Sequence, residues 1–167
     1  MADNTVYHAY TTKYDGRSQK LINDVQVAHK EKICDATALW DTGATGTCVS
    51  EELVNELGLI PTGKLNISTP SGSSVVNTYS VDILFPNKVV IKDVVVCGTK
   101  IGEQGIQVLI GMDIITLGDF SVSNFEGKTT FSFRIPSKTE TDYVKEINRE
   151  NLIGPKHGKG KRKKKRK

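Results

Sequence analysis

Cysteine is scarce in this chain, and the segments that would mark a secreted or membrane protein are missing. The 167 residues include three cysteines, which form no CxxC pair and lie beside no histidine cluster. An odd number of cysteines without a recognisable leader argues against a disulfide framework. The first residues lack the basic and apolar segments of a signal peptide, and no apolar run approaches the ~20 residues that span a bilayer. We therefore expect a cytoplasmic protein without a membrane span.

Histidine is equally scarce, which bears on metal binding and on cysteine chemistry. His8, His29 and His157 have no metal-ligand spacing, so we expect neither a metal site nor a cofactor. Cys48 stands close to Asp41 in the sequence and would suit a nucleophile. No motif places a histidine to activate it, and we interpret it as a buried small residue.

Aromatic residues are few, at 7% of the chain, whereas there are 15 glycines. This balance is typical of a small β-rich domain with many turns. Hydrophobic residues make up 37%, enough for one modest core. We expect one main domain over residues 1–136, a helix and linker over 137–155, and a polybasic tail without fixed structure over 156–167.

Acidic residues are absent from that tail, which holds nine lysines and arginines. Removing these nine from the total of 23 leaves 14 basic against 19 acidic residues in the rest of the chain, so the body is acidic. The tail suits weak, salt-sensitive contact with nucleic acid or another anionic surface. The alternative is a solubilising tail, and the sequence favours neither reading.

Alternating apolar and β-branched residues predict an all-β domain. The alternation and its turn residues predict strands over residues 6–14, 21–28, 34–40, 47–49, 65–69, 75–85, 89–97, 107–110, 120–125 and 129–135. In the strand 75–85 the odd-numbered side chains form one mostly apolar stripe, which Asn77 alone interrupts.

Three helices are expected among these strands. Ser50 is placed to cap a helix that ends at Gly58, with acidic residues in its first turn. A shorter helix is predicted over 112–117, and a third over 139–152 with one apolar side.

The segment Asp41-Thr42-Gly43-Ala44 carries the chemistry. An apolar strand delivers Asp41 into a loop of small residues, where a carboxylate can activate water if a second carboxylate shares its proton. The glycine permits close approach of the backbone, and the Thr42 hydroxyl can brace the loop. Taken alone, the triplet has an alternative reading as a turn in which Asp41 caps backbone N–H groups.

Two longer stretches give the triplet its context. Residues 39–50, Leu-Trp-Asp-Thr-Gly-Ala-Thr-Gly-Thr-Cys-Val-Ser, resemble the active-site segment of retropepsins, the retroviral-type aspartic peptidases. About seventy residues further on, 108–115 resemble the second signature of that family, an apolar pair and a glycine followed by a short helix. A Ser/Gly-tipped hairpin lies between them, where the family has its flap. The resemblance covers roughly residues 6–135.

This resemblance implies a single-lobed, closed, barrel-like acid protease fold, with Asp41 as the catalytic carboxylate and Thr42, Gly43 and Ala44 as its supporting loop. It implies a flap tip at Ser71, Gly72 and Ser73 that covers an extended peptide or protein substrate. It also implies structural roles for Gly111 and Asp113 in the second signature.

The chain departs from viral retropepsins at two positions. Thr45 stands where those usually carry an acid, and Met112 where they usually carry arginine. The two partners are therefore absent together, and the sequence is more similar to the cellular and bacterial branch.

The triplet occurs once, whereas two-lobed relatives carry it twice. The second carboxylate must then come from another copy of the chain, so we expect a homodimer in which two Asp41 side chains meet. Two other functions remain open at this point. One is a non-catalytic dimer that holds peptides in the same cleft, and the other is a nucleic-acid-associated protein acting through its tail.

Overall fold

Strands make up most of the structure, a computed structural model that describes residues 5–69, 72–102 and 105–153. The predicted flap residue Ser71 and the basic tail 156–167 lie outside these ranges. The strands are β1 (His8–Lys13), β2 (Ile22–His29), β3 (Lys32–Trp40), β4 (Cys48–Ser50), β5 (Gly63–Thr69), β6 (Gly72–Leu84), β7 (Val90–Thr99), β8 (Val108–Ile110), β9 (Asp119–Ser123) and β10 (Thr130–Ile135). The α-helices are α1 (Glu51–Leu57), α2 (Met112–Ile115) and α3 (Tyr143–Ile153). Each predicted strand and helix overlaps an element of the structure.

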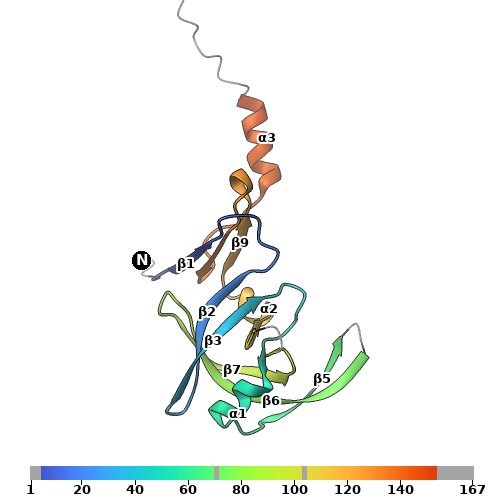
Figure 1. The fold of residues 1–167 in the computed structure, drawn as a ribbon. Helices are drawn as coiled ribbons and strands as arrows, with labels where there is room; N and C mark the ends of the chain where they lie inside the picture. Colours follow the sequence, from blue (N-terminus) through green and yellow to red (C-terminus); the bar gives the residue numbers. More distant parts are fainter. Residues whose placement is uncertain (1–4, 70–71, 103–104, 154–167) are drawn as a thin grey trace, which may run out of the picture.

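Six strands close into a barrel (Figure 1). They follow the order β2-β3-β8-β4-β7-β6, and a further pairing of β2 with β6 joins the two ends. At this closure Val27 lies opposite Ile83, and both side chains are fully buried. The pairs β3–β8 and β4–β7 are parallel, and the other pairs around the ring are antiparallel. The predicted all-β, closed, barrel-like architecture is confirmed.

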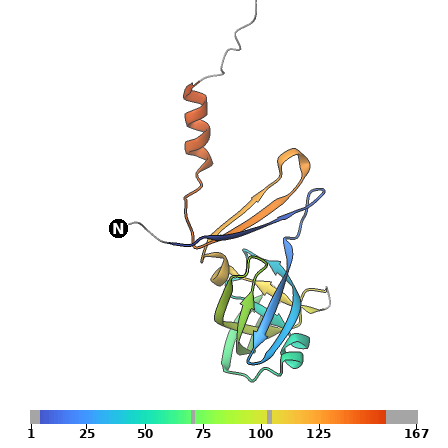
Figure 2. The ribbon, with the colours of Figure 1, turned by 90° about the vertical axis from the view of Figure 1, so that its left-hand side faces the viewer.

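A second sheet, with the order β1-β10-β9, lies beside the barrel (Figure 2). Aromatic rings join the two sheets. Trp40, at the end of β3, lies 5.1 Å from Phe131 and 4.9 Å from Phe133 between ring centroids. Its indole Nε1–H donates to Asn23 Oδ1 at 2.5 Å. Fully burying one large apolar side chain contributes about 1.5–3 kcal/mol, so this cluster joins the two sheets firmly. It also fixes the residue that precedes Asp41.

Helix α1 begins and ends where the sequence predicts. The Ser50 hydroxyl accepts a hydrogen bond from the backbone N–H of Leu53 at 3.2 Å, which satisfies one of the free donors of the first turn. Gly58 closes the helix in the left-handed conformation, at φ 65°. Leu53 and Leu57 are buried, so the helix packs against the barrel through this side.

The apolar stripe predicted along β6 is buried along only part of its length. Tyr79, Val81 and Ile83 lie in the core, whereas Val75 is 65% exposed and Asn77 is also exposed. The apolar stripe therefore coincides with the core only in the second half of the strand. The first half pairs with β5 in a hairpin that extends beyond the barrel, and no second layer of the described residues covers it (Figure 1).

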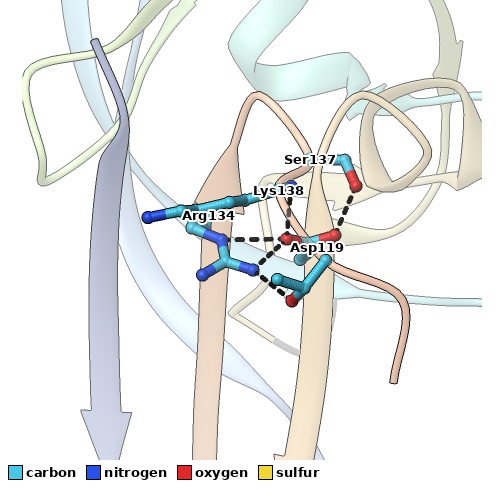
Figure 3. A network of polar contacts seen from close by, with 5 residues as sticks. Asp119, Arg134, Ser137 and Lys138 are labelled. Atoms are coloured by element: carbon cyan, nitrogen blue, oxygen red, sulfur yellow. Dashed lines mark hydrogen bonds and ion pairs between the residues drawn. The ribbon is translucent and has the colours of Figure 1, made fainter. Parts of the chain in front are cut away.

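Helix α3 stands apart from both sheets in the two perpendicular views (Figures 1 and 2). None of its side chains is buried, and its apolar side is open to solvent. The segment that leads to it is held by Asp119, which accepts hydrogen bonds from the Ser137 hydroxyl at 2.5 Å and from the Lys138 N–H at 2.9 Å and pairs with Arg134 (Figure 3). The Ser137 hydroxyl, then the other donors, hold the pKa of Asp119 below its ordinary value. Among the described residues, no helix has the length and apolar character that a membrane crossing requires.

Candidate active site

Asp41 lies at the point where β3 leaves the barrel core. Its backbone N–H donates to the Ile110 carbonyl of β8 at 3.0 Å, which continues the parallel β3–β8 pairing into the loop. The side chain is partly buried, and its Oδ1 accepts the Gly43 N–H at 2.8 Å. Within the part of the chain that the structure describes, Oδ2 forms no hydrogen bond. Asp41 is thus oriented through one oxygen, and the other remains available for a ligand.

The rest of the Asp41 loop faces solvent. Thr42, Gly43 and Thr45 are exposed, and Ala44 is partly buried. The loop turns tightly, because the Ala44 N–H donates to the Asp41 carbonyl at 3.2 Å. Across the described ranges the Thr42 hydroxyl forms no hydrogen bond, so the bracing expected of it comes from another residue.

That residue is Thr47, which is buried at the end of the loop. Its hydroxyl donates to Asp113 Oδ1 at 2.7 Å and accepts the Gly111 N–H at 3.1 Å. Its backbone N–H donates to Asp113 Oδ2 at 2.9 Å. Both carboxylate oxygens of Asp113 therefore accept hydrogen bonds from Thr47 and hold the end of the Asp41 loop in place. The sequence offered only one signal for Thr47, a hydroxyl residue directly after a glycine at the start of the predicted strand 47–49.

The Asp41 loop and the start of α2 lie in backbone contact. The Met112 N–H donates to the Ala44 carbonyl at 2.8 Å, and the Asp113 N–H donates to the Thr45 carbonyl at 3.1 Å. Gly111 lies so close to Gly46 that a Cβ atom at Gly111 would stand 2.6 Å from the Gly46 carbonyl carbon and oxygen. The structure thus brings together the two segments on which the sequence prediction rests.

The predicted flap is the hairpin of β5 and β6. Gly72 and Ser73 are exposed near its tip, and Gly72 has a φ of 130°, a value that favours glycine. Ser73 lies opposite Ser68, and Gly72 opposite Thr69. Ser71 lies outside the described residues.

Among the cavities formed by the described residues, two adjoin the barrel, and Asp41 lines neither of these two. One, of about 340 Å³, lies at the root of the hairpin between Lys64, Val75 and Tyr79. The other, of about 440 Å³, lies beside Asp24, Asp35 and Lys88. The described ranges contain no group of three or more histidine, cysteine or acidic side chains arranged to hold a metal ion.

A family model described as aspartyl protease matches residues 24–114, a stretch that includes Asp41, Thr47 and Gly111. This chain belongs to the aspartyl protease family. Proteases are hydrolases of peptide bonds. The matched segment runs from β2 to α2. No curated protein sequence matches the chain.

Two solved structures of proteases are similar to this aspartyl protease family member. A retropepsin-like aspartic protease from Rickettsia conorii is 14% identical, with a TM-score of 0.47, and the match covers 78% of this chain and 96% of that one. The protease of Simian Foamy Virus (mac) is 20% identical, with a TM-score of 0.41, and the match covers 57% of this chain and 89% of that one.

Proposed function

We propose that the protein is an aspartic endopeptidase that acts as a homodimer, with Asp41 of each copy as one of two catalytic carboxylates. The observation that carries this proposal is the Asp41 loop within an aspartyl protease domain whose sequence holds the Asp-Thr-Gly triplet once. Asp113 is a poor candidate for the second carboxylate, because Thr47 and the Ile114 N–H already bond its two oxygens. A second copy related by a two-fold axis supplies an equivalent Asp41.

The exposure of the loop supports a contact between two copies. Thr42, Gly43 and Thr45 are small and exposed around a partly buried Asp41. Two such loops can approach face to face without displacing a core side chain. In this arrangement a cleft forms between the two copies and lies above both carboxylates.

Two carboxylates in contact do not both ionise readily, so one proton stays between them. The ionised Asp41 then takes a proton from a water molecule, and the protonated one donates to the scissile carbonyl oxygen. The Gly43 N–H, 2.8 Å from Oδ1, holds the carboxylate in place while the protons move.

The hairpin of β5 and β6 is the proposed cover of the cleft. Its outer strand β5 has one unpaired edge in the described sheet order, and Gly72 and Ser73 lie near its tip. An extended peptide can pair its backbone with such an edge and place alternate side chains in pockets. This supports peptides and proteins as the substrate class.

The decisive experiment replaces Asp41 by asparagine and measures cleavage of a peptide library from acid to neutral pH. We expect Asp41→Asn to lose activity by at least about 10³-fold, because it removes both the base and the acid of the pair. Asp15→Asn removes one carboxylate at an exposed turn and should cleave like the parent. Cleavage by Asp41→Asn at the parental rate would refute the proposal, and peptide binding by the parent without turnover at any pH would favour a non-catalytic module.

A mixing experiment tests the sharing of the site between two copies. When the parent is equilibrated with an equal amount of Asp41→Asn chain, random exchange leaves about half of the parent chains in fully active dimers. Activity should therefore fall to about half that of the parent alone, and it should fall further with excess variant. Activity that stays unchanged would show that each chain works alone.

A further inference from the structure

Cys48 and Cys97 lie side by side at the base of the Asp41 loop. They are register partners on the neighbouring parallel strands β4 and β7, so their side chains point to the same face. The Cys97 N–H donates to the Thr47 carbonyl at 3.1 Å, and the Cys48 sulfur lies 3.9 Å from the Gly46 carbonyl oxygen. Cys48 is partly exposed, whereas Cys97 is 5% exposed. The pair is thus reachable by a small molecule from one side.

The two thiols come from facing register positions and influence each other's ionisation. The hydrogen bond from the Cys48 thiol lowers the pKa of Cys97 to about 7. The same hydrogen bond, together with burial, raises the pKa of Cys48 above its ordinary value. Loss of the Cys97 proton near neutral pH therefore leaves a thiolate beside a thiol, which is the combination that reacts with oxidants.

The spacing of the strands permits a bond between the two sulfur atoms. Neighbouring strands lie about 4.7–4.9 Å apart, which is inside the Cα separation of about 4.4–6.8 Å found across disulfides. The Cβ atoms of a disulfide lie about 3.5–4.5 Å apart, slightly closer than the strands. Bond formation therefore has to draw β4 a short way toward β7.

We propose that Cys48 and Cys97 form a reversible oxidation site, in which a peroxide converts the two thiols to a disulfide that alters the Asp41 loop. The thiolate attacks one oxygen of the peroxide, the O–O bond breaks, and hydroxide (or alkoxide) leaves. The resulting sulfenic acid is attacked by the second sulfur. The S–S bond forms as the S–O bond breaks, and the thiol proton leaves with the departing hydroxyl as water. A dithiol reductant reverses the change by thiol–disulfide exchange.

The expected effect on the loop follows from the position of Thr47. This residue directly precedes Cys48, and its hydroxyl joins Asp113 to Gly111. Movement of β4 toward β7 shifts Thr47 and lengthens these hydrogen bonds. The oxidised protein should therefore cleave peptides more slowly, an effect that rests on the proposed peptidase function.

Cys34 provides an internal control. It is partly exposed, lies on β3, and pairs in register with Val27. Burial, followed by the nearby Glu56, raises the pKa of the Cys34 thiol above its ordinary value. The Cys34 thiol is accessible to peroxide, but it should react more slowly than the pair because less of it is ionised.

The test exposes the full-length chain to one equivalent of hydrogen peroxide at neutral pH, followed by alkylation and mass spectrometry. We expect a mass loss of about 2 Da, a peptide link between Cys48 and Cys97, one remaining alkylatable thiol, and recovery with dithiothreitol. Cys34→Ser should behave in the same way, whereas Cys48→Ser and Cys97→Ser should form no intramolecular link. The parental link carries the test even if a variant fails to fold.

Disulfide formation and peptide cleavage are measured in separate assays. Asp41→Asn should form the same link, which makes the oxidation result independent of catalysis. Two free thiols at positions 48 and 97 after peroxide treatment would overturn the proposal. So would a link through Cys34, or oxidation to acids that the reductant does not reverse. If the link forms and the activity of an active parent is unchanged, the control of the loop is refuted, whereas a parent that never cleaves refutes the proposed function alone.

Discussion

Replacement of Gly111 by alanine should separate the two halves of the candidate active site. The added Cβ would lie 2.6 Å from the carbonyl carbon and oxygen of Gly46 and 3.0 Å from its Cα. Ordinary contact begins at 3.4 Å, so the two backbones have to part by about 0.8 Å. The neighbouring atoms are main-chain atoms, and no flexible side chain can move aside.

The free-energy cost can be worked from the bonds that this movement strains. Insertion of a methyl group into a packed site costs about 1–3 kcal/mol. Three hydrogen bonds cross the contact, from the N–H groups of Gly111, Met112 and Asp113, and each contributes about 0.5–1.5 kcal/mol when intact. Because these bonds weaken and do not break, we expect Gly111→Ala to lower the unfolding free energy by about 2–4 kcal/mol. For a chain of this size, the melting temperature should fall by roughly 5–15 °C.

Gly46→Ala is the matched control on the other side of the same contact. A Cβ at Gly46 would have its nearest neighbour, Asp113 Oδ2, at 4.0 Å, and the backbone there has no positive φ. The substitution should change stability by less than about 1 kcal/mol and can even stabilise by restricting the unfolded chain. Both variants are compared by urea unfolding at neutral pH, with peptide cleavage as a second readout. Equal stability of the two variants would refute the reasoning.

Three further predictions concern residues outside the loop. The difference in unfolding free energy between the parent and Asp119→Asn should shrink as the pH falls below about 4. The pKa of the Asp119 carboxyl is lower in the folded chain than in the unfolded chain, so the ionised carboxylate stabilises the fold at pH values above the unfolded pKa. This stabilisation is lost as the pH falls through the folded pKa, and a difference between the two proteins that does not depend on pH would contradict the prediction. Ser50→Ala should destabilise by about 1–2 kcal/mol in chemical denaturation, because the Leu53 N–H loses its acceptor, and an unchanged midpoint would count against the cap. Phe131→Ala should cost about 3–5 kcal/mol in the same assay, whereas Phe125→Ala, 79% exposed, should cost almost nothing; similar losses would mean that the aromatic cluster does not join the sheets.

Much of the fold could be predicted from the sequence, because it is encoded in local patterns. Alternation of apolar residues indicated each strand, and Ser50 and Gly58 marked the ends of α1. The order of the Asp41 loop, the hairpin and Gly111 could also be read directly. These features depend on side chains that are close together in the chain.

The remainder depends on contacts between distant residues, which no local pattern encodes. The pairing of Val27 with Ile83 closes the barrel, and its register follows from the whole sheet. The link from Thr47 to Asp113 spans 66 positions and needs the folded loop to exist. The exposure of Val75 depends on the absence of a covering layer, although its alternation is the same as that of buried Val81. The catalytic role of Asp41 and the three-part division of the chain stay predictions.

The strand β6 belongs to the barrel in its second half and to the outer hairpin in its first half. From Thr78 onward the strand pairs with β7 and β2 in the barrel, whereas its register partners before Thr78 lie on β5 alone. Changes of sequence or length in the outer half therefore alter no hydrogen bond of the ring. The sequence of the outer hairpin, which is the part proposed to cover a ligand, can therefore change during evolution while the residues that pair within the barrel are kept. Grafting a hairpin from another family member onto positions 63–77 is the laboratory equivalent of that change.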